Sequence, residues 1–280
     1  MGSGGKVTTG QRVVEVDEQC LHESRRLFAQ CLELDPVRQF FGGALQSSDQ
    51  LLQILVGASL DFIVWHEVFH HVLGHVRSFY GFGFPGLGER SSMNYSAVPN
   101  DPVRQPSSID LRACELSADT QAILMIWRFQ RLLRTHPDSR YAGLSRREML
   151  KIVSFSVMTT FALISSGEPR LGLYELGMDS DGTHSPSVFT RSETYPHPAV
   201  RMMQVDAQLE RQSKLSWFYR DRRTTLDALG IVASLGKTGI LPFEIVDPIL
   251  RDPKLLLHNS RQIAEHWTRI SSDVEPFGLL

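Results

Sequence analysis

The chain has 280 residues, 42% of them hydrophobic, so it can bury a sizeable core as one large domain or as a domain with a helical extension. Its charge is nearly balanced, with 29 basic and 31 acidic residues, which argues against a nucleic-acid partner. Cys20 and Cys31 are eleven positions apart on one predicted helix, about 16 Å along its axis and too far for a disulfide. We therefore expect reduced, buried thiols and a cytoplasmic protein.

The chain carries no pattern of a signal peptide or of a membrane span. Its most apolar run, from Leu51 to Trp65, is about 15 residues long, whereas a membrane span needs about 20. We interpret this run as a core helix. Residues 1–16 are polar and rich in glycine at their start, and we expect them to form a flexible N-terminus.

Helical periodicity dominates the remainder, and we expect a mainly α fold, zincin-like α+β with at most a small sheet. Capping boxes at Ser107 to Asp110 and at Ser145 to Glu148 mark two helix starts. Two long stretches rich in Gly, Pro and Ser, residues 81–108 and 167–198, are predicted loops that could gate a cleft. The predicted helices span about 17–34, 48–79, 107–135, 145–165, 198–229, 242–250 and 260–272.

The sequence His66-Glu67-Val68-Phe69-His70 has the pattern H-E-x-x-H. Two histidines four positions apart lie on one face of a helix, so both imidazoles can reach one ion at about 2.0–2.1 Å. Glu67 is rotated by about 100° to the edge of that face, where it can hold a metal-bound water without binding the metal. The pattern predicts a zinc site, one ion per chain, with Glu67 as the general base.

A catalytic zinc site of this kind needs a third protein ligand, and we favour Glu115. Glu115 and Asp119 are four positions apart on a separate, downstream helix, so they share one face. In this interpretation Glu115 binds the metal and Asp119 supports a ligating histidine. The reverse assignment, with Asp119 as ligand and Glu115 as support, stays open.

Together these motifs resemble the gluzincin metallopeptidases, with the pattern H-E-x-x-H…E-x-x-A-D. The continuation to Gly74-His75 is similar to the heat-shock and CAAX-prenyl-protein metallopeptidases, and the chain also resembles soluble Lit-like phage-exclusion peptidases. Tyr195-Pro196-His197-Pro198, with Arg201 shortly after, looks like the His-Pro…Arg segment of those families. The membrane members of this group have transmembrane helices, which this chain lacks by prediction, so the soluble peptidases are the better match.

The resemblance implies that His66, His70 and Glu115 bind zinc, that Glu67 is the catalytic base and that Asp119 orients a ligand. It also implies that His197 and Arg201 lie beside the cleft, where they stabilise the oxyanion or order the site. Ordinary turn structure for His197 and a surface charge or structural ion pair for Arg201 are the alternatives. Tyr195 is a further candidate oxyanion donor, although an aromatic residue before proline more often packs.

His71 and His75 form another pair four positions apart. On a continuing helix they point roughly 140–180° away from His66, so we expect them to pack or hydrogen-bond in the core, with a second metal site as the alternative. Cys114 precedes the proposed ligand by one position and is expected to lie in the core rather than to act as a switch on the metal.

The resulting hypothesis is a zinc-dependent endopeptidase acting on a protein or peptide; the resemblance to the soluble peptidases implies a single dedicated target. We expect a metallopeptidase domain over residues 17–230, with the active-site helix packed centrally against the helix of the third ligand. Residues 231–280 are expected to form a helical extension packed on it. The alternatives are a catalytically silent, metal-stabilised regulatory protein and a zinc hydrolase of non-peptide amides; a latent peptidase that needs an activator is a variant of the main hypothesis.

Overall fold

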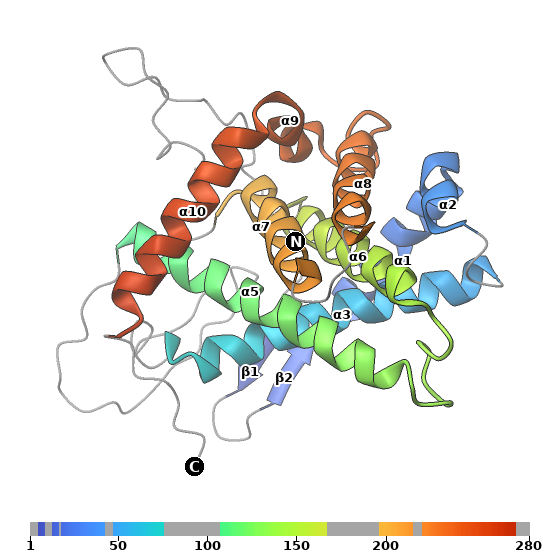
Figure 1. The fold of residues 1–280 in the computed structure, drawn as a ribbon, viewed down its shortest axis with the longest axis horizontal. Coiled ribbons are helices and arrows are strands. Elements are labelled where there is room, and N and C mark those ends of the chain that lie inside the picture. Colours follow the sequence, from blue (N-terminus) through green and yellow to red (C-terminus); the bar gives the residue numbers. More distant parts are fainter. Residues whose placement is uncertain are drawn as a thin grey trace.

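The computed structural model describes residues 5–8, 13–16, 18–42, 47–75, 107–166, 196–214 and 220–272, and these fold mainly into helices (Figure 1). The prediction of a mainly α fold is confirmed, whereas its zincin-like character stays a prediction. Most of both predicted long loops, and Tyr195, lie outside the described residues. The helices are α1 (Glu18–Glu33), α2 (Asp35–Phe41), α3 (Ser48–Val72), α5 (Ser108–Leu133), α6 (Arg146–Ser166), α7 (Pro198–Lys214), α8 (Arg220–Leu235), α9 (Phe243–Arg251) and α10 (Pro253–Ile270).

The core is built around α3, α5, α6 and α7. Helix α3 packs against α5 and α6, and α7 packs against both α5 and α6 (Figure 1). The apolar middle of α3 is buried, as expected for a central helix, and its Ser59 hydroxyl shares a 2.6 Å hydrogen bond with Thr160 of α6. The predicted packing of the His66 helix against the Glu115 helix is therefore observed.

Both predicted capping boxes are present. The Ser107 side chain accepts a hydrogen bond from the Asp110 backbone N–H, and the Asp110 carboxylate accepts one from the Ser107 backbone N–H. Ser145 and Glu148 make the same reciprocal pair at the start of α6. These caps satisfy backbone donors that a helix start leaves unpaired, and they set where α5, the helix of Glu115, begins.

Several helix boundaries differ from the prediction. Asp35-Pro36, directly after the predicted helix 17–34, begins a further helix, α2, because proline is tolerated in the first turn of a helix. The predicted helix 198–229 is two helices, α7 and α8, which pack against each other, and α8 runs through the expected domain boundary at residue 230. Helix α10 starts at Pro253 rather than near 260, because the Asp252 side chain caps it by accepting from the Leu255 N–H at 3.0 Å.

The N-terminal segment, expected to be flexible, contains an antiparallel pair of strands. Strand β1 (Gly5–Thr8) pairs with β2 (Val13–Val16) so that Gly5 faces Val16 and Thr8 faces Val13. The β-branched valines of β2 favour an extended backbone, a signal that the glycine-rich start of the segment obscured. The pair lies against α3 (Figure 1).

The three cysteines are free and buried, as predicted. Burial raises the pKa of the Cys31 thiol and of the Cys114 thiol, so both stay protonated at neutral pH. By length and composition one described helix, α3, could cross a membrane between Ser48 and His70. Because 61% of its apolar window is buried inside the protein, and core helices pass the same test, this is weak evidence for a span.

Phe155 joins α1 and α2 to the core, which leads to a stability prediction. Its ring is fully buried (0% exposed), with ring centroids 5.4 Å from Phe41 and 6.2 Å from Phe28. Phe155→Ala leaves a cavity where helices meet and should lower the free energy of unfolding by about 3–5 kcal/mol in urea denaturation. The matched control is Phe129→Ala, whose ring is 41% exposed and should lose less than half as much. Equal losses would show that Phe155 is not part of a packed core.

Candidate metal centre

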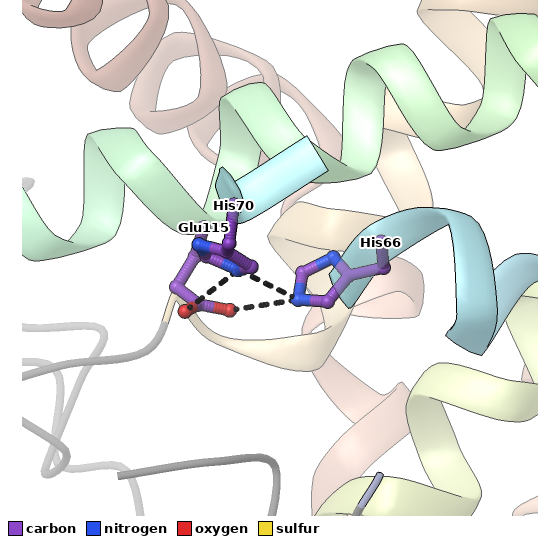
Figure 2. Close-up of side chains that lie close together, drawn as sticks. All are labelled: His66, His70 and Glu115. Carbon is purple, nitrogen blue, oxygen red and sulfur yellow. Dashed lines mark hydrogen bonds and ion pairs between the residues drawn. The ribbon is translucent and has the colours of Figure 1, made fainter. Parts of the chain in front are cut away.

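Two histidines of α3 and one glutamate of α5 converge at the contact between these helices (Figure 2). His66 Nε2 lies 3.0 Å from His70 Nε2, and the two Glu115 carboxylate oxygens each lie 3.4 Å from one of these nitrogens. All three side chains are only 1% exposed. The structure therefore brings together the three residues predicted as metal ligands.

This arrangement could hold a metal ion. Ligand atoms around a tetrahedral zinc, at about 2.0–2.1 Å from the ion, are about 3.3 Å apart, close to the three observed separations. Two imidazoles and one carboxylate are also a donor set typical of catalytic zinc sites with an open fourth position. The geometry and the chemistry of the three side chains thus fit a metal ion.

Asp119 stands on the other side of the His66 ring. Its Oδ1 lies 2.9 Å from His66 Nδ1, whereas His66 Nε2 faces Glu115. A carboxylate in this position orients the imidazole and increases its basicity. The geometry therefore favours Glu115 as the third ligand and Asp119 as the residue that orients His66.

Arg201 of α7 completes this chain of contacts. Its Nε donates to Asp119 Oδ2 at 2.7 Å and its Nη2 donates to Asp119 Oδ1 at 2.6 Å, a bidentate pair that is buried. The same Nη2 is 3.9 Å from Glu115 Oε2, and the guanidinium lies 4.5 Å from the Phe161 ring centroid. Of the alternatives for Arg201, the structure shows a buried ion pair rather than a surface charge. The expected role beside the cleft stays a prediction.

His197 is the N-cap of α7. Its Nδ1 accepts a hydrogen bond from the Ala199 N–H at 2.9 Å, and its carbonyl accepts one from the Arg201 N–H at 3.1 Å. Burial lowers the pKa of His197 to about 3, so the ring is neutral, with its proton on Nε2 because Nδ1 is an acceptor. His197 and Arg201 are four residues apart and share one face of α7. The expected oxyanion role of His197 stays a prediction.

Glu67 follows His66 on α3 and is buried. Burial, opposed by His66 and reinforced by the negative charge of Glu115, raises the pKa of Glu67 to about 7. Among the described residues its Oε1 has no hydrogen-bond partner. A buried carboxylate that can gain or lose a proton near neutral pH has the properties of a general base.

His75 is buried and hydrogen-bonded in the core, as expected, but the direction predicted for it was wrong. Ser117 was not singled out at all. Helix α3 ends at Val72, and Gly74 adopts φ 77°, so His75 turns back toward the site instead of continuing away from it. Its Nδ1 lies 3.0 Å from His70 Nδ1, and its Nε2 lies 3.1 Å from Ser117 Oγ. The signal was Gly74, because glycine just past a helix commonly ends it. The side chain of His71 lies outside the described residues.

The C-terminal helix also reaches the site. The Trp267 ring of α10 lies edge-on against His75, with centroids 4.8 Å apart. One position earlier, His266 Nε2 lies 2.7 Å from Oδ1 of Asp110, which forms the capping box of α5 with Ser107. Residues 253–270 are thus in contact with residues around the candidate metal centre, which nothing in the sequence had suggested.

The Asp119–Arg201 pair predicts a large difference between two arginine substitutions. Arg201→Met should lower the free energy of unfolding by about 3–5 kcal/mol, because it leaves the Asp119 carboxylate buried without its cation. The control, Arg251→Met, breaks a pair with Asp247 on a side chain that is 71% exposed and should cost about 1 kcal/mol or less. Urea denaturation of both metal-free variants gives the comparison. Similar losses would mean that the buried pair contributes no more than a surface pair.

The charge state of His66 predicts how metal binding depends on pH. Burial alone would lower the pKa of His66, but the carboxylates of Asp119 and Glu115 outweigh burial and raise it to about 10. In the metal-free protein this imidazole is therefore protonated at pH 7–9, and a bound metal must displace its proton. Zinc affinity measured against a competing chelator should rise up to about tenfold per pH unit for this proton. An affinity that is flat between pH 7 and 9 would contradict the assignment.

Comparisons with protein-family models, with curated proteins and with solved structures return no match to this chain. The resemblance to gluzincin peptidases, which depends on three short motifs, is therefore neither supported nor opposed by a relative. The spatial arrangement adds a separate observation: motif residues about 50 positions apart, His66 and Glu115, meet in one buried group that could hold a metal ion.

Proposed function

We propose that this chain is a zinc-dependent endopeptidase of the gluzincin type, with zinc held by His66, His70 and Glu115 and with Glu67 as general base. One observation carries the proposal. Three ligand atoms from two helices lie within 4.8 Å of one another, and the residue next to His66 is a buried carboxylate with a raised pKa. A metal site with three protein ligands and an adjacent base is the arrangement used for hydrolysis by activated water.

A zinc ion at this position would polarise the scissile carbonyl and lower the pKa of a bound water to about 7. Glu67 would accept a proton from the attacking water and later pass it to the leaving amine. The raised pKa of Glu67 suits both steps, because a group that titrates near 7 can take up and release a proton at neutral pH. Asp119, fixed by Arg201, keeps His66 oriented throughout.

His197 is the proposed stabiliser of the oxyanion. Its Nδ1 is occupied by the Ala199 N–H, so the ring can offer an N–H donor only from Nε2. A neutral donor of fixed orientation can stabilise the negative charge that develops in the transition state. The substrate class proposed for this chemistry is a protein or peptide.

A metal-stabilised regulatory protein is the second candidate. The ligands are almost fully buried, and through Asp119 and Arg201 the site links α3, α5 and α7, so an ion here would also hold helices together. In that case Glu67 would have no catalytic role. The two functions therefore make opposite predictions for a substitution of this residue alone.

Glu67→Gln tests the proposal, since it removes the base and keeps the size of the side chain. The wild type should hold one zinc per chain by elemental analysis, and so should Glu67→Gln, whereas His70→Ala and Glu115→Ala should lose it. With a defined peptide library and mass spectrometry of the products, kcat/KM of Glu67→Gln should fall at least about a hundredfold. Glu265→Gln, on an exposed position of α10, is the matched control and should keep full activity.

Two results would count against the peptidase. A wild type that takes up no zinc, even when zinc is added, would remove the metal centre. A zinc-loaded wild type that matches Glu67→Gln in cleaving no peptide or protein would instead favour the regulatory function, and cleavage of small amides alone would favour a non-peptide hydrolase.

A further inference from the structure

Three buried side chains form a continuous line of contacts behind His70. Ser117 Oγ lies 2.9 Å from the carbonyl oxygen of Cys114 and 3.1 Å from His75 Nε2, and His75 Nδ1 lies 3.0 Å from His70 Nδ1. Ser117 is on α5, two positions after Glu115. His70 is near the end of α3, and His75 lies in the turn after it. The line therefore connects the two ligand-bearing helices on the side away from the metal position.

The Cys114 carbonyl, at the end of this line farthest from His70, determines which atom donates in each hydrogen bond. The Cys114 carbonyl can only accept, so the single hydroxyl proton of Ser117 is donated to it. Ser117 Oγ must then accept from His75, which puts the His75 proton on Nε2 and leaves its Nδ1 as an acceptor. His75 Nδ1 in turn accepts from His70, which puts the His70 proton on Nδ1.

A proton on His70 Nδ1 leaves the lone pair on Nε2, the atom that faces His66 and Glu115. Only an unprotonated nitrogen can bind a metal, so this tautomer is the one that a metal site requires. The 3.0 Å contact between the Nε2 atoms of His66 and His70 agrees with it. That contact needs one proton, and the line of hydrogen bonds makes His66 the donor and His70 the acceptor.

The line is also held in place sterically. The His75 ring is fully buried, with the Trp267 ring of α10 packed against it. The turn at Gly74, with φ 77°, sets the position of His75 and is a conformation that side chains other than glycine rarely adopt. Both ends of this line of hydrogen bonds are thus fixed. One end is the backbone of α5 at Cys114, and the other is His70 on α3.

We propose that Ser117 and His75 are positioning residues that fix the metal-binding tautomer of His70 through a relay ending on the Cys114 carbonyl. The two histidine ligands would then be oriented by different means, His66 by the Asp119 carboxylate and His70 by a neutral imidazole. This inference rests on the metal centre of the proposed function, but its first test does not require metal. Loss of an outer partner of a ligating histidine typically weakens metal binding 10–100-fold.

The first test reads the tautomers directly. Long-range proton–nitrogen NMR of the histidine rings distinguishes an N–H nitrogen from a bare one, and it is recorded on the protein as purified and again after chelation. The relay predicts His75 with its proton on Nε2 and His70 with its proton on Nδ1 in both samples. The opposite tautomer of His75, or a His75 ring that changes tautomer with metal, would overturn the relay.

The second test measures zinc affinity against a chromophoric chelator. Ser117→Ala and His75→Phe should each weaken zinc binding about 10–100-fold, and His75→Phe keeps a ring against Trp267. Ser117→Thr retains the hydroxyl and should keep most of the affinity.

Ser234→Ala is the matched control. Ser234 donates to the Ile231 carbonyl three residues earlier at 2.7 Å, as Ser117 does to the Cys114 carbonyl. Among its described contacts, however, Ser234 has no histidine partner. Thermal unfolding of each metal-free variant separates lost affinity from lost folding.

The outcomes distinguish the relay from the proposed function. If the wild type binds zinc and His70→Ala does not, but Ser117→Ala and His75→Phe bind as tightly as the wild type, the relay is wrong and the metal centre stands. If the wild type binds no zinc while NMR finds the expected tautomers, the hydrogen bonds of the relay stand and the proposed function falls. Weaker binding in Ser117→Ala with rescue in Ser117→Thr supports both.

Discussion

The ion pair between Asp119 and Arg201 is the interaction on which the rest of the site depends. It is buried and bidentate, and it joins α5 to α7 at the point where Asp119 also contacts His66 of α3. A carboxylate removed from water costs several kcal/mol unless a cation and hydrogen bonds compensate for it. Arg201 supplies both, and its guanidinium lies against the Phe161 face of α6. The Asp119–Arg201 pair thus makes contacts with four helices, α3, α5, α6 and α7.

Buried charge also explains why this group suits a cation. Among the described residues, the three carboxylates of Glu67, Glu115 and Asp119 interact with one arginine, Arg201, and protonation of His66 only partly offsets the excess of negative charge within this set. The raised pKa of Glu67 is a sign of the same excess, since its ionised form is disfavoured both by burial and by Glu115. A divalent ion between His66, His70 and Glu115 would neutralise this cluster and replace the proton on His66. Metal binding and ionisation of Glu67 are thus favoured together.

Much of this site could be predicted from the sequence because its parts are local. H-E-x-x-H and the Glu115–Asp119 pair depend only on the helical period, and the cap at Ser107 depends on a four-residue pattern. The residues that could not be predicted depend on tertiary contacts or on where a helix ends. The role of Ser117 follows from helix packing, and that of His75 from the turn at Gly74, which reverses the direction that a longer helix would give. The boundary between α7 and α8 was missed for a related reason: the two helices pack against each other, and apolar periodicity along the sequence does not reveal such a contact.

The contacts of α10 bear on what counts as the functional unit. Residues 231–280 are expected to form a helical extension packed on the domain, and in the structure Trp267 lies against the His75 ring while His266 contacts Asp110 of the α5 capping box. Because the orientation of His70 depends on His75, packing by α10 acts on the metal position through two buried side chains. Among the described residues the candidate ligands come from two helices, α3 and α5, and the groups that contact them come from α5, α7 and the turn after α3, with α10 packed over that turn. A metal centre at this position would therefore depend on the packing of these helices rather than on the motif alone, and a short motif match by itself would not reveal it.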